Sequence, residues 1–316
     1  MPTAPTLWPV MRFAGAAHAT YYNHIANPAR ECCGDTTEQT MSHSADFDCL
    51  RIERPSPQIC VLELHRPESR NALSWQLMRE LKSALLNIDQ DNRCRVVILR
   101  GAGKSFCAGL DLFDQNNPDS LRATLGELKP GSRSGMRAQE FMADIALLMR
   151  RIQQPIIAAV QGHAYGGGLA LALACDLRMA ADSARFCTQF IRLGISGCDF
   201  GVSYTLPRLI GASRAHDMML TARLVDADQA EHWGLVSRRV SDDALHSESL
   251  ALAESLCEFS PYGLISTKQA MWENLNANSL QQAIQLENRN QILNGLSGDV
   301  EEAAAAFFEK RKPRFE

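Results

Sequence analysis

Two glycine-containing turns are the segments of this sequence best suited to chemistry. The first is FCAGLD at 106–111 and the second is GHAYGGG at 162–168. Each follows an apolar, strand-like segment and opens a helix-like one, so its main-chain N–H groups lie at the positive end of a helix dipole. Small residues let a ligand approach this backbone closely. Two such turns facing each other would form an oxyanion hole with two N–H donors.

The glycines could instead belong to a nucleotide site or serve only close packing. The run Gly166–Gly168 does not match G-x-G-x-x-G, and the sequence contains no G-x-x-x-x-G-K-[ST], which disfavours a phosphate cradle for nucleotides. Close packing of a helix on a strand would account for either turn alone. The occurrence of both turns, each between a strand and a helix, favours a site.

The elements that must position these turns follow from periodicity. The segments at 49–55 and 59–67 alternate as two paired strands, and 95–101, 155–162 and 176–182 are short apolar strands. Ser74 is placed to cap a helix that runs to about Asp89, with Leu77, Leu81, Leu85 and Ile88 on one face. We expect a mobile loop over 114–136, a helix ending at Arg151, and a glycine-opened helix over 165–175.

The C-terminal part is predicted to be helical. From Ser213 onward the pattern is that of helices, with Asp226, Ser279 and Asp299 as candidate caps. This order predicts α/β structure in the first two thirds and all-α structure at the end. The predicted regions are an N-terminal extension over 1–45, a core over 46–240 and a helical region over 241–316. Periodicity alone does not say whether the strands form one sheet or a coiled stack.

Composition excludes several classes of protein. The 316 residues are 46% hydrophobic and 22% charged, with a net charge of −4, which gives no support for a nucleic-acid surface. The ten cysteines show no C-x-x-C or Cys/His ligand spacing, so we expect thiols in a reducing compartment and no metal site. The most apolar stretch, 155–175, is interrupted by Gln161, His163 and glycines, so no membrane span is expected.

The first 45 residues differ from the rest because they lack sustained periodicity and contain four prolines. Their first acidic residue is Glu31. Three interpretations stay open: translation from Met41, a disordered extension, or a transit peptide. We expect a cytoplasmic protein, or a mitochondrial one if the segment is a transit peptide.

Several longer blocks resemble the crotonase superfamily, the enoyl-CoA hydratase/isomerase family. They include HRPESRNALSWQLMRELKSAL, VVILRGAGKSFCAGLDL, PIIAAVQGHAYGGGLALALACDLRMAADSARF and LTARLVDADQAEHWGLVSRRV, and AAAFFEKRKPRF resembles the closing helix. The similarity covers about residues 47–316, in order. It implies an α/β fold, the crotonase (ClpP-like) superhelix of ββα units with an all-helical C-terminal trimerisation region. It also implies a homotrimer or homohexamer.

The resemblance further implies an acyl-CoA substrate and no cofactor beyond the coenzyme A within it. The oxyanion donors would be the N–H groups of Ala108 and Gly167, which would hold a thioester oxygen as an enolate forms. The residues implied to contact substrate or CoA are Arg70, Ala72, Ala108, Gly109, Leu110, Asp111, Gly167, Lys268 and Lys310 with its neighbours Arg311 and Lys312. For the basic residues, the alternative is solvated surface charge.

The sequence departs from the family at the two catalytic glutamates. Ala170 and Phe190 stand at those positions, and neither side chain can position water or move a proton. Asp199 matches the aspartate of dienoyl-CoA isomerase-like members if one residue is inserted. In a dry pocket its pKa would rise, which suits proton transfer, so Asp199 is our candidate acid/base. The alternative is that Asp199 caps a helix that starts near Val202.

Several further side chains are candidates for the second carboxylate or for packing roles. Glu140, Asp144 and Asp114 could reach an acyl pocket, whereas His163 and Tyr165 are expected to pack. Nothing marks Cys107 or Cys198 as an activated nucleophile.

We therefore predict isomerisation or hydration of an enoyl-CoA-type thioester. The alternatives are thioester hydrolysis, decarboxylation or carbon–carbon cleavage on the same fold, or a degenerate protein that only binds acyl-CoA.

Overall fold

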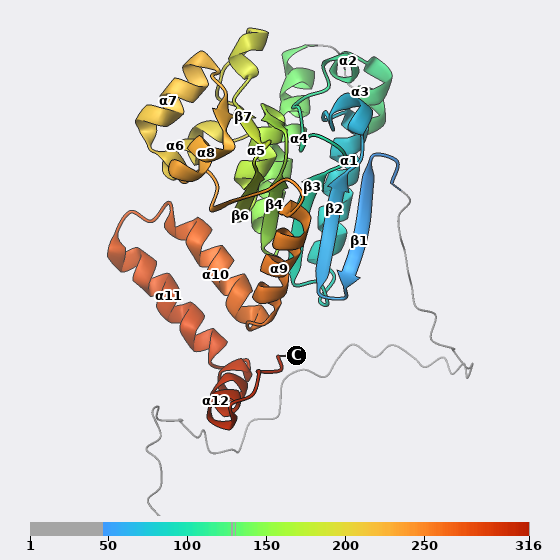
Figure 1. Ribbon diagram of the computed structural model, residues 1–316. Helices are drawn as coiled ribbons and strands as arrows, with labels where there is room; N and C mark the ends of the chain where they lie inside the picture. The colour runs from blue at the N-terminus through green and yellow to red at the C-terminus, as the bar shows by residue number, and fades with distance from the viewer. Residues whose placement is uncertain (1–46, 128, 130, 316) are drawn as a thin grey trace, which may run out of the picture. The chain divides into compact units, whose positions relative to one another are not determined.

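The computed structural model describes residues 47–127, 129 and 131–315, so the predicted extension over 1–45 lies outside the described residues (Figure 1). A six-stranded sheet runs through the described part. Its strands, in spatial order, are β1 (Leu50–Ser56), β2 (Ile59–Leu64), β3 (Val96–Gly101), β4 (Ile156–Val160), β6 (Leu177–Ala181) and β9 (Arg238–Val240). β1 is antiparallel to β2, and the other neighbours are parallel.

A second, three-stranded sheet joins β5 (His163–Tyr165), β7 (Arg185–Cys187) and β8 (Val225–Asp226). β5 and β7 are parallel, and β7 and β8 are antiparallel. Because β5 is the middle of the second glycine turn, this small sheet fixes one side of that turn. The five predicted strands are confirmed and all belong to the large sheet, whereas β9 and the three strands of the small sheet were not predicted.

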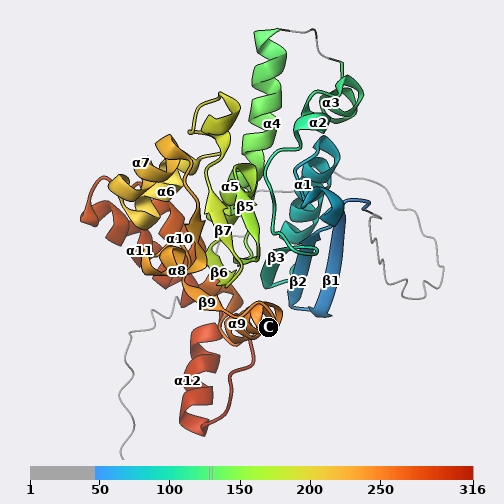
Figure 2. The same cartoon turned by 45° about the horizontal axis from the view of Figure 1, so that its top comes forward.

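The inner strands of the large sheet, β2, β3, β4 and β6, are buried on both faces, whereas the edge strands β1 and β9 are largely exposed. Along β2, Cys60, Leu62 and Leu64 belong to one core, and Ile59 and Val61 belong to the other, as the two-residue repeat of a strand requires. Helices α1 (Trp75–Asp89), α4 (Ser132–Arg151) and α5 (Gly167–Ala174) contribute to the first core, and α9 (Leu245–Cys257) contributes to the second. The helices around the sheet can be followed in Figures 1 and 2.

Helix α1 forms as predicted. The Ser74 hydroxyl accepts a hydrogen bond from the Leu77 N–H at 3.1 Å, so it satisfies one of the free donors at the helix start. The face at Leu77, Leu81, Leu85 and Ile88 is buried against the sheet. This helix therefore holds the loop that precedes it, Arg70–Leu73, against the first glycine turn.

The expectation of one mobile loop over 114–136 is wrong. The segment contains the second half of α2 (Leu112–Gln115), all of α3 (Pro118–Leu125) and the start of α4. Asp111 caps α2 by accepting from two main-chain N–H groups, and Asn117 caps α3, which has proline at its first position. These cap residues outweigh the polar composition that suggested a loop.

The remaining helices are α6 (Val202–Ile210), α7 (Ala212–Thr221), α8 (Ala227–His232), α10 (Pro261–Asn274), α11 (Leu280–Asn294) and α12 (Asp299–Glu309), with short 3₁₀ turns η1 (Pro67–Ser69) and η2 (Phe190–Leu193). The predicted caps Asp226 and Ser279 are confirmed, since each accepts from the main chain three residues on. The cap of α12 is Gly298, one residue before the predicted Asp299.

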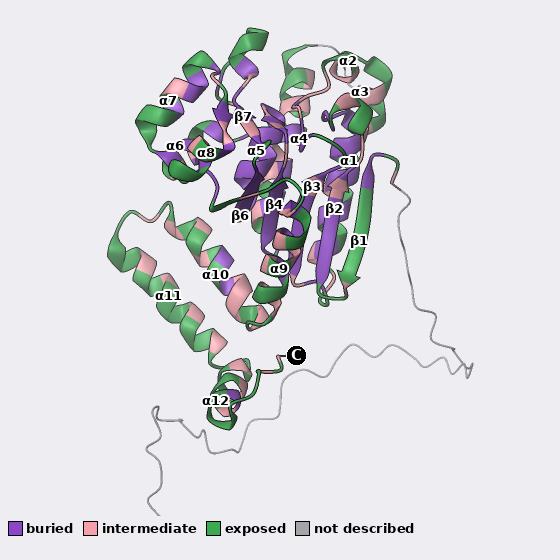
Figure 3. Cartoon of the chain, in the orientation of Figure 1, coloured by how far each residue is buried: buried purple, intermediate pink, exposed green. Residues whose placement is uncertain are grey.

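Helices α10–α12 differ from the core in burial, because most of their surface is exposed (Figure 3). Several large apolar side chains on these helices and on the connection between α11 and α12 face solvent in the single chain: Met271, Leu280, Ile292, Leu296, Phe307 and Phe308. No helix in the described part of the chain is long and apolar enough to cross a membrane.

Candidate active site

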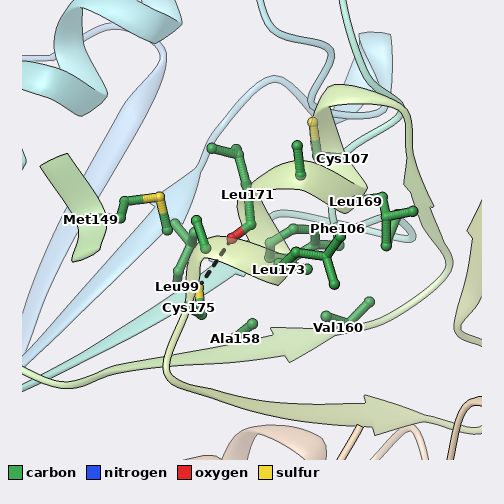
Figure 4. Packing of buried hydrophobic residues seen from close by; sticks show 14 of the residues in the cluster. Leu99, Phe106, Cys107, Met149, Ala158, Val160, Leu169, Leu171, Leu173 and Cys175 are labelled. Carbon is green, nitrogen blue, oxygen red and sulfur yellow. Dashed lines mark hydrogen bonds between the residues drawn. The ribbon is translucent and has the colours of Figure 1, made fainter. Parts of the chain in front are cut away.

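Helix α5 anchors the second glycine turn in the core. All eight of its residues are buried, which is the pattern of a helix that is apolar on every side. Leu169, Leu171 and Leu173 pack among side chains of β3, β4 and α4, and the Cys175 thiol donates to the Leu171 carbonyl at 3.3 Å (Figure 4). These contacts with β3, β4 and α4 fix the position of the N-terminus of α5.

The two glycine turns lie side by side and are joined by main-chain hydrogen bonds. The Cys107 N–H donates to the His163 carbonyl at 2.8 Å, and the Tyr165 N–H donates to the Cys107 carbonyl at 3.0 Å. A third bond links Phe106 N–H to the Gln161 carbonyl at 2.7 Å. The expectation that the turns face each other is confirmed, because these bonds form a short parallel bridge between them.

Two glycines are required for this close approach. A Cβ at Gly168 would lie 2.2 Å from the Cys107 carbonyl oxygen, which is closer than any real contact. A Cβ at Gly109 would lie 2.8 Å from the Tyr165 carbonyl oxygen, and Gly109 has a φ of +100°, which side chains disfavour. The turns can therefore meet only with glycine at these positions.

A pocket of about 120 Å³ lies between the turns. Its lining consists of Ala108, Gly109, Leu110, Leu112, Gly166, Gly167, Gln189, Phe190 and Leu193. None of the hydrogen bonds in the described part of the chain uses the N–H of Gly167, the first residue of α5. The Ala108 N–H donates to the Arg70 carbonyl at 3.0 Å. The structure thus brings both predicted donors, the N–H groups of Ala108 and Gly167, to one pocket. Of the two, the Ala108 N–H is already hydrogen-bonded to the Arg70 carbonyl.

The residues expected to contact CoA near the first turn also cluster. The Leu73 N–H donates to the Gly109 carbonyl at 2.7 Å, which ties the Arg70–Ala72 loop to the turn. Arg66, which was not predicted from the sequence, donates to the Ala72 carbonyl at 2.6 Å and pairs with Asp111 at 2.9 Å. Arg66 therefore braces the two segments, and Asp111 is committed to this pair and to capping α2.

Lys268 is a correction to the sequence prediction. Its side chain is 2% exposed, and its ammonium donates to the carbonyls of Met149 and Gln154 at 2.9 and 2.8 Å and pairs with Asp176 at 3.1 Å. These three partners use all three of its donors, so Lys268 has none left for a CoA phosphate. It fastens α10 to the end of α4.

The basic residues Lys310, Arg311 and Lys312 are exposed, as expected both for a contact to CoA and for solvated surface charge. Lys310 ends α12 in a left-handed conformation. Arg311 pairs with Glu302 and Glu309, and Lys312 pairs with Glu258. The structure places these residues at the end of α12 and not among the lining residues of the pocket between the turns. A contact from Lys310 to CoA stays a prediction.

The positions of the two missing glutamates line two different pockets. Phe190, the first residue of η2, is buried and lines the pocket between the turns. Ala170, one helical turn after Gly166, lines a neighbouring pocket instead. The lining of the first pocket includes no carboxylate, so the departure from the family pattern leaves this pocket without an acid or base of its own.

Asp199 is half-buried just before α6. Its carboxylate accepts from the Phe200 N–H at 2.8 Å and from the Gln139 side chain of α4. Burial raises the pKa of the Asp199 carboxyl above its usual range, and the two hydrogen bonds oppose this rise. The capping interpretation is not supported by these contacts, because the residue at the cap position of α6 is Gly201 and the carboxylate does not accept from the first turn of α6.

The other candidate acids have structural partners or lie elsewhere. Asp144 pairs with Lys82, and Asp114 accepts from the Trp75 N–H at 2.7 Å at the start of α1. Glu140 is exposed on α4. None of the three belongs to the pocket between the turns.

The side chains of His163, Tyr165 and Cys107 are not placed for catalysis. The His163 ring packs edge-on against Tyr165 at 4.9 Å and contacts the Ser105 hydroxyl, as expected for packing. Burial raises the pKa of Cys107 to about 12, which keeps this thiol protonated and unreactive.

Comparison with known proteins is decisive for the family. The model of the family described as enoyl-CoA hydratase/isomerase matches residues 54–316, most of the chain. The chain belongs to this family. It is similar to the probable enoyl-CoA hydratase EchA12 of Mycobacterium tuberculosis, with 41% identity over 84% of this chain and 91% of the relative. It is also 34% identical to the 1,2-epoxyphenylacetyl-CoA isomerase of Escherichia coli, over 81% of this chain and 94% of that enzyme.

Solved structures confirm the crotonase fold that the sequence motifs predicted. A probable enoyl-CoA hydratase/isomerase from Mycobacterium abscessus is 40% identical and superimposes with a TM-score of 0.78, over 85% of this chain and 98% of the other. A monofunctional enoyl-CoA isomerase from M. smegmatis is 38% identical, with a TM-score of 0.63 over 75% of this chain and 98% of that one. This chain is therefore a crotonase-fold member of mixed α/β structure with a helical C-terminal region.

Proposed function

We propose that this crotonase isomerises the double bond of an enoyl-CoA-type thioester through an enolate. The observation that carries the proposal is that the main-chain donors and the candidate acid/base are in separate parts of the site. The pocket between the turns offers main-chain donors and no carboxylate. Asp199, a half-buried carboxylate with a raised pKa, accepts from the N–H of Phe200, which lines the neighbouring pocket together with Ala170. The relatives named above as a hydratase and an isomerase both act on CoA thioesters by name, which supports the substrate class.

The thioester oxygen would accept from the N–H groups of Gly167 and Ala108. Gly167 is ready to donate, since its N–H points out of the first turn of α5. Ala108 would exchange the Arg70 carbonyl for the thioester oxygen, and the exchange becomes favourable as the oxygen gains negative charge. One such donor is typically worth a factor of about 10²–10³ in rate.

Isomerisation suits a site with one proton carrier better than hydration does. In our proposal Asp199 takes a proton from the α carbon of a 3-enoyl thioester, and the electron pair moves to the oxygen. The same carboxyl then returns the proton to the γ carbon, which leaves a conjugated 2-enoyl thioester. Hydration also requires a water held for attack, and Ala170 and Phe190 stand where the family holds it. CoA enters only as part of the substrate.

We further propose that the chain works as a homotrimer or homohexamer. The exposed apolar side chains of α10–α12, such as Met271, Phe307 and Phe308, support this proposal, because single chains rarely leave so many large apolar groups in water.

The test compares a 3-enoyl-CoA with the matching 2-enoyl-CoA. Isomerisation of the first creates the absorbance of a conjugated thioester, and hydration of the second destroys it. We expect the wild-type chain to act on the 3-enoyl substrate much faster than on the 2-enoyl substrate. Rapid hydration of the 2-enoyl substrate without isomerisation would refute the proposal.

The variant Asp199→Asn tests the proton carrier. We expect it to lower kcat by about 10²–10⁴-fold and to leave CoA affinity unchanged. Asp144→Asn is the matched control, since that carboxylate pairs with Lys82. Because the base must be ionised, wild-type kcat/KM should rise with pH through a pKa above the usual aspartate range. An Asn variant with full activity would remove Asp199 from the mechanism.

A further inference from the structure

A second pocket, of about 150 Å³, adjoins the proposed site along α4. Its lining residues are Ala143, Ala146, Leu147 and Arg150 of α4, Ala170 and Ala174 of α5, and Phe200, Gly201 and Thr205 at the start of α6. Four of these are alanines, so the pocket stays open where larger side chains would fill it. Ala170 is the position at which the family carries a glutamate, so this pocket begins at the reaction centre.

One face of α4 connects the candidate acid/base to the far end of the pocket. Gln139, Ala143, Ala146 and Arg150 follow one another at spacings of four, three and four residues, which places them on one side of the helix. Gln139 binds the Asp199 carboxylate. At 1.5 Å per residue, Arg150 lies about 16 Å farther along the helix axis. Arg150 therefore lines the pocket on this face of α4, and Gln139, which binds Asp199, lies one helical turn before the lining residue Ala143.

Arg150 has no counter-ion among the described residues. Its Nε atom is buried without a hydrogen-bond partner, one terminal nitrogen donates to the Thr205 hydroxyl at 2.7 Å, and the group stacks on Trp272 at 4.0 Å. No carboxylate of the described residues lies within ion-pair distance. Burial lowers the pKa of Arg150, as expected of a cation that has lost water without gaining an anion.

The charged neighbours of Arg150 do not relieve this imbalance. The acid near it, Asp176, already pairs with Lys268 and accepts from the Trp272 ring N–H and the Ile156 N–H, both at 2.7 Å. On the other side, the Arg208 guanidinium stacks on Tyr204 at 3.6 Å and adds a second positive charge. Arg150 is partly buried, and a partly desolvated cation without an ion-pair partner is destabilising, so an anion that binds here would recover part of that cost.

We propose that Arg150 binds an anionic group at the distal end of the acyl chain, so that the preferred substrates are enoyl-CoA thioesters with a terminal carboxylate. This inference rests on the proposed function, since it takes the thioester end of the substrate to lie at the glycine turns. The planar guanidinium can hold a carboxylate through two parallel hydrogen bonds, which gives selectivity over a methyl end.

The experiment compares two substrates of equal chain length, one ending in a methyl group and one in a carboxylate. For the wild-type chain we expect kcat/KM to favour the carboxylate by about 10- to 100-fold. Arg150→Gln should abolish this preference and leave kcat/KM for the methyl-ended substrate within about threefold of wild type. Arg151→Gln, the exposed neighbour on the last turn of α4, is the matched control and should keep the preference.

The outcomes separate this inference from the proposed function. If neither substrate reacts, the proposed function fails. If both react equally in the wild-type chain, the inference is wrong and the function stands. Equal losses on both substrates and on free CoA binding in Arg150→Gln would mean that Arg150 contacts CoA phosphate, and a changed oligomeric state with unchanged selectivity would assign Arg150 to an interface. Both results overturn the inference.

A second variant serves if Arg150→Gln does not fold. Ala146→Leu fills the middle of the pocket and leaves the Arg150 guanidinium in the chain. It should lower kcat/KM for the long carboxylate-ended substrate at least tenfold and leave a four-carbon enoyl-CoA unaffected. An Ala146→Leu enzyme that keeps full selectivity for the long carboxylate-ended substrate would show that the acyl chain takes another path, and would overturn the inference.

Discussion

Replacing Lys268 with methionine tests the reassignment of this lysine from ligand contact to internal fastener. Methionine keeps an unbranched apolar stem of matching length and removes the ammonium. The change leaves the carbonyls of Met149 and Gln154 without donors and leaves Asp176 without its cation. An unsatisfied buried acceptor costs about 1–3 kcal/mol, and breaking a buried ion pair from one side costs about 3–5 kcal/mol.

These two costs overlap, because both arise from the same lost ammonium. We therefore expect Lys268→Met to lower the free energy of unfolding by about 3–5 kcal/mol. Lys82→Met is the control, since Lys82 also pairs with an aspartate, Asp144, but at a site open to water. An exposed pair is worth at most about 1 kcal/mol, so the control should lose little stability.

The assay is equilibrium unfolding in urea followed by far-ultraviolet circular dichroism, at one protein concentration for all variants. Binding of CoA to the folded variants, measured by calorimetry, is the second readout, and it should not change in Lys268→Met. The reasoning is refuted if Lys268→Met unfolds within about 1 kcal/mol of wild type while its affinity for CoA falls. That result would return Lys268 to the ligand.

The remaining predictions concern the two turns and the thiols. Gly168→Ala should lower both stability, by about 2–4 kcal/mol, and turnover, because the new Cβ forces the turns apart at the Cys107 carbonyl; a fully active variant in a turnover assay would contradict this. Iodoacetamide at neutral pH should alkylate the exposed Cys198 and spare Cys107, whose pKa burial raises to about 12; peptide mass spectrometry showing early Cys107 labelling would disagree. Ala170→Glu should shrink the second pocket and lower activity on long acyl chains more than on short ones, and equal losses would count against that pocket as the acyl path.

The sequence was most informative where a local rule leaves few choices. Ser74 and the leucine face of α1 could be predicted because capping and helical periodicity act within a few residues. The contact between the two turns was also predictable, since glycine at Gly109 and Gly168 has value mainly where backbones meet. The departures at Ala170 and Phe190 needed only the family pattern.

The remaining features depend on contacts between distant segments. The sequence around Lys268 does not indicate that its ammonium binds Met149, Gln154 and Asp176, because these partners are 92 or more residues away in the chain (268 − 176 = 92). Arg66 was missed for the same reason, as its partner Asp111 belongs to another element. The 3.6-residue period of α4 could have pointed to the shared face of Gln139, Ala143 and Arg150, but only the structure shows that this face borders a pocket.

The main-chain joint between the glycine turns has a consequence for how this protein can change. The bonds between Cys107, His163 and Tyr165 use only peptide groups, and the donors proposed to hold the thioester oxygen are peptide N–H groups as well. Substitutions can alter side chains on these segments without removing those groups, so long as the glycines stay. The main-chain groups proposed to bind the oxyanion can therefore be retained while side chains change. Substitutions at positions such as Ala170 and Phe190 can then replace one reaction with another on the same backbone.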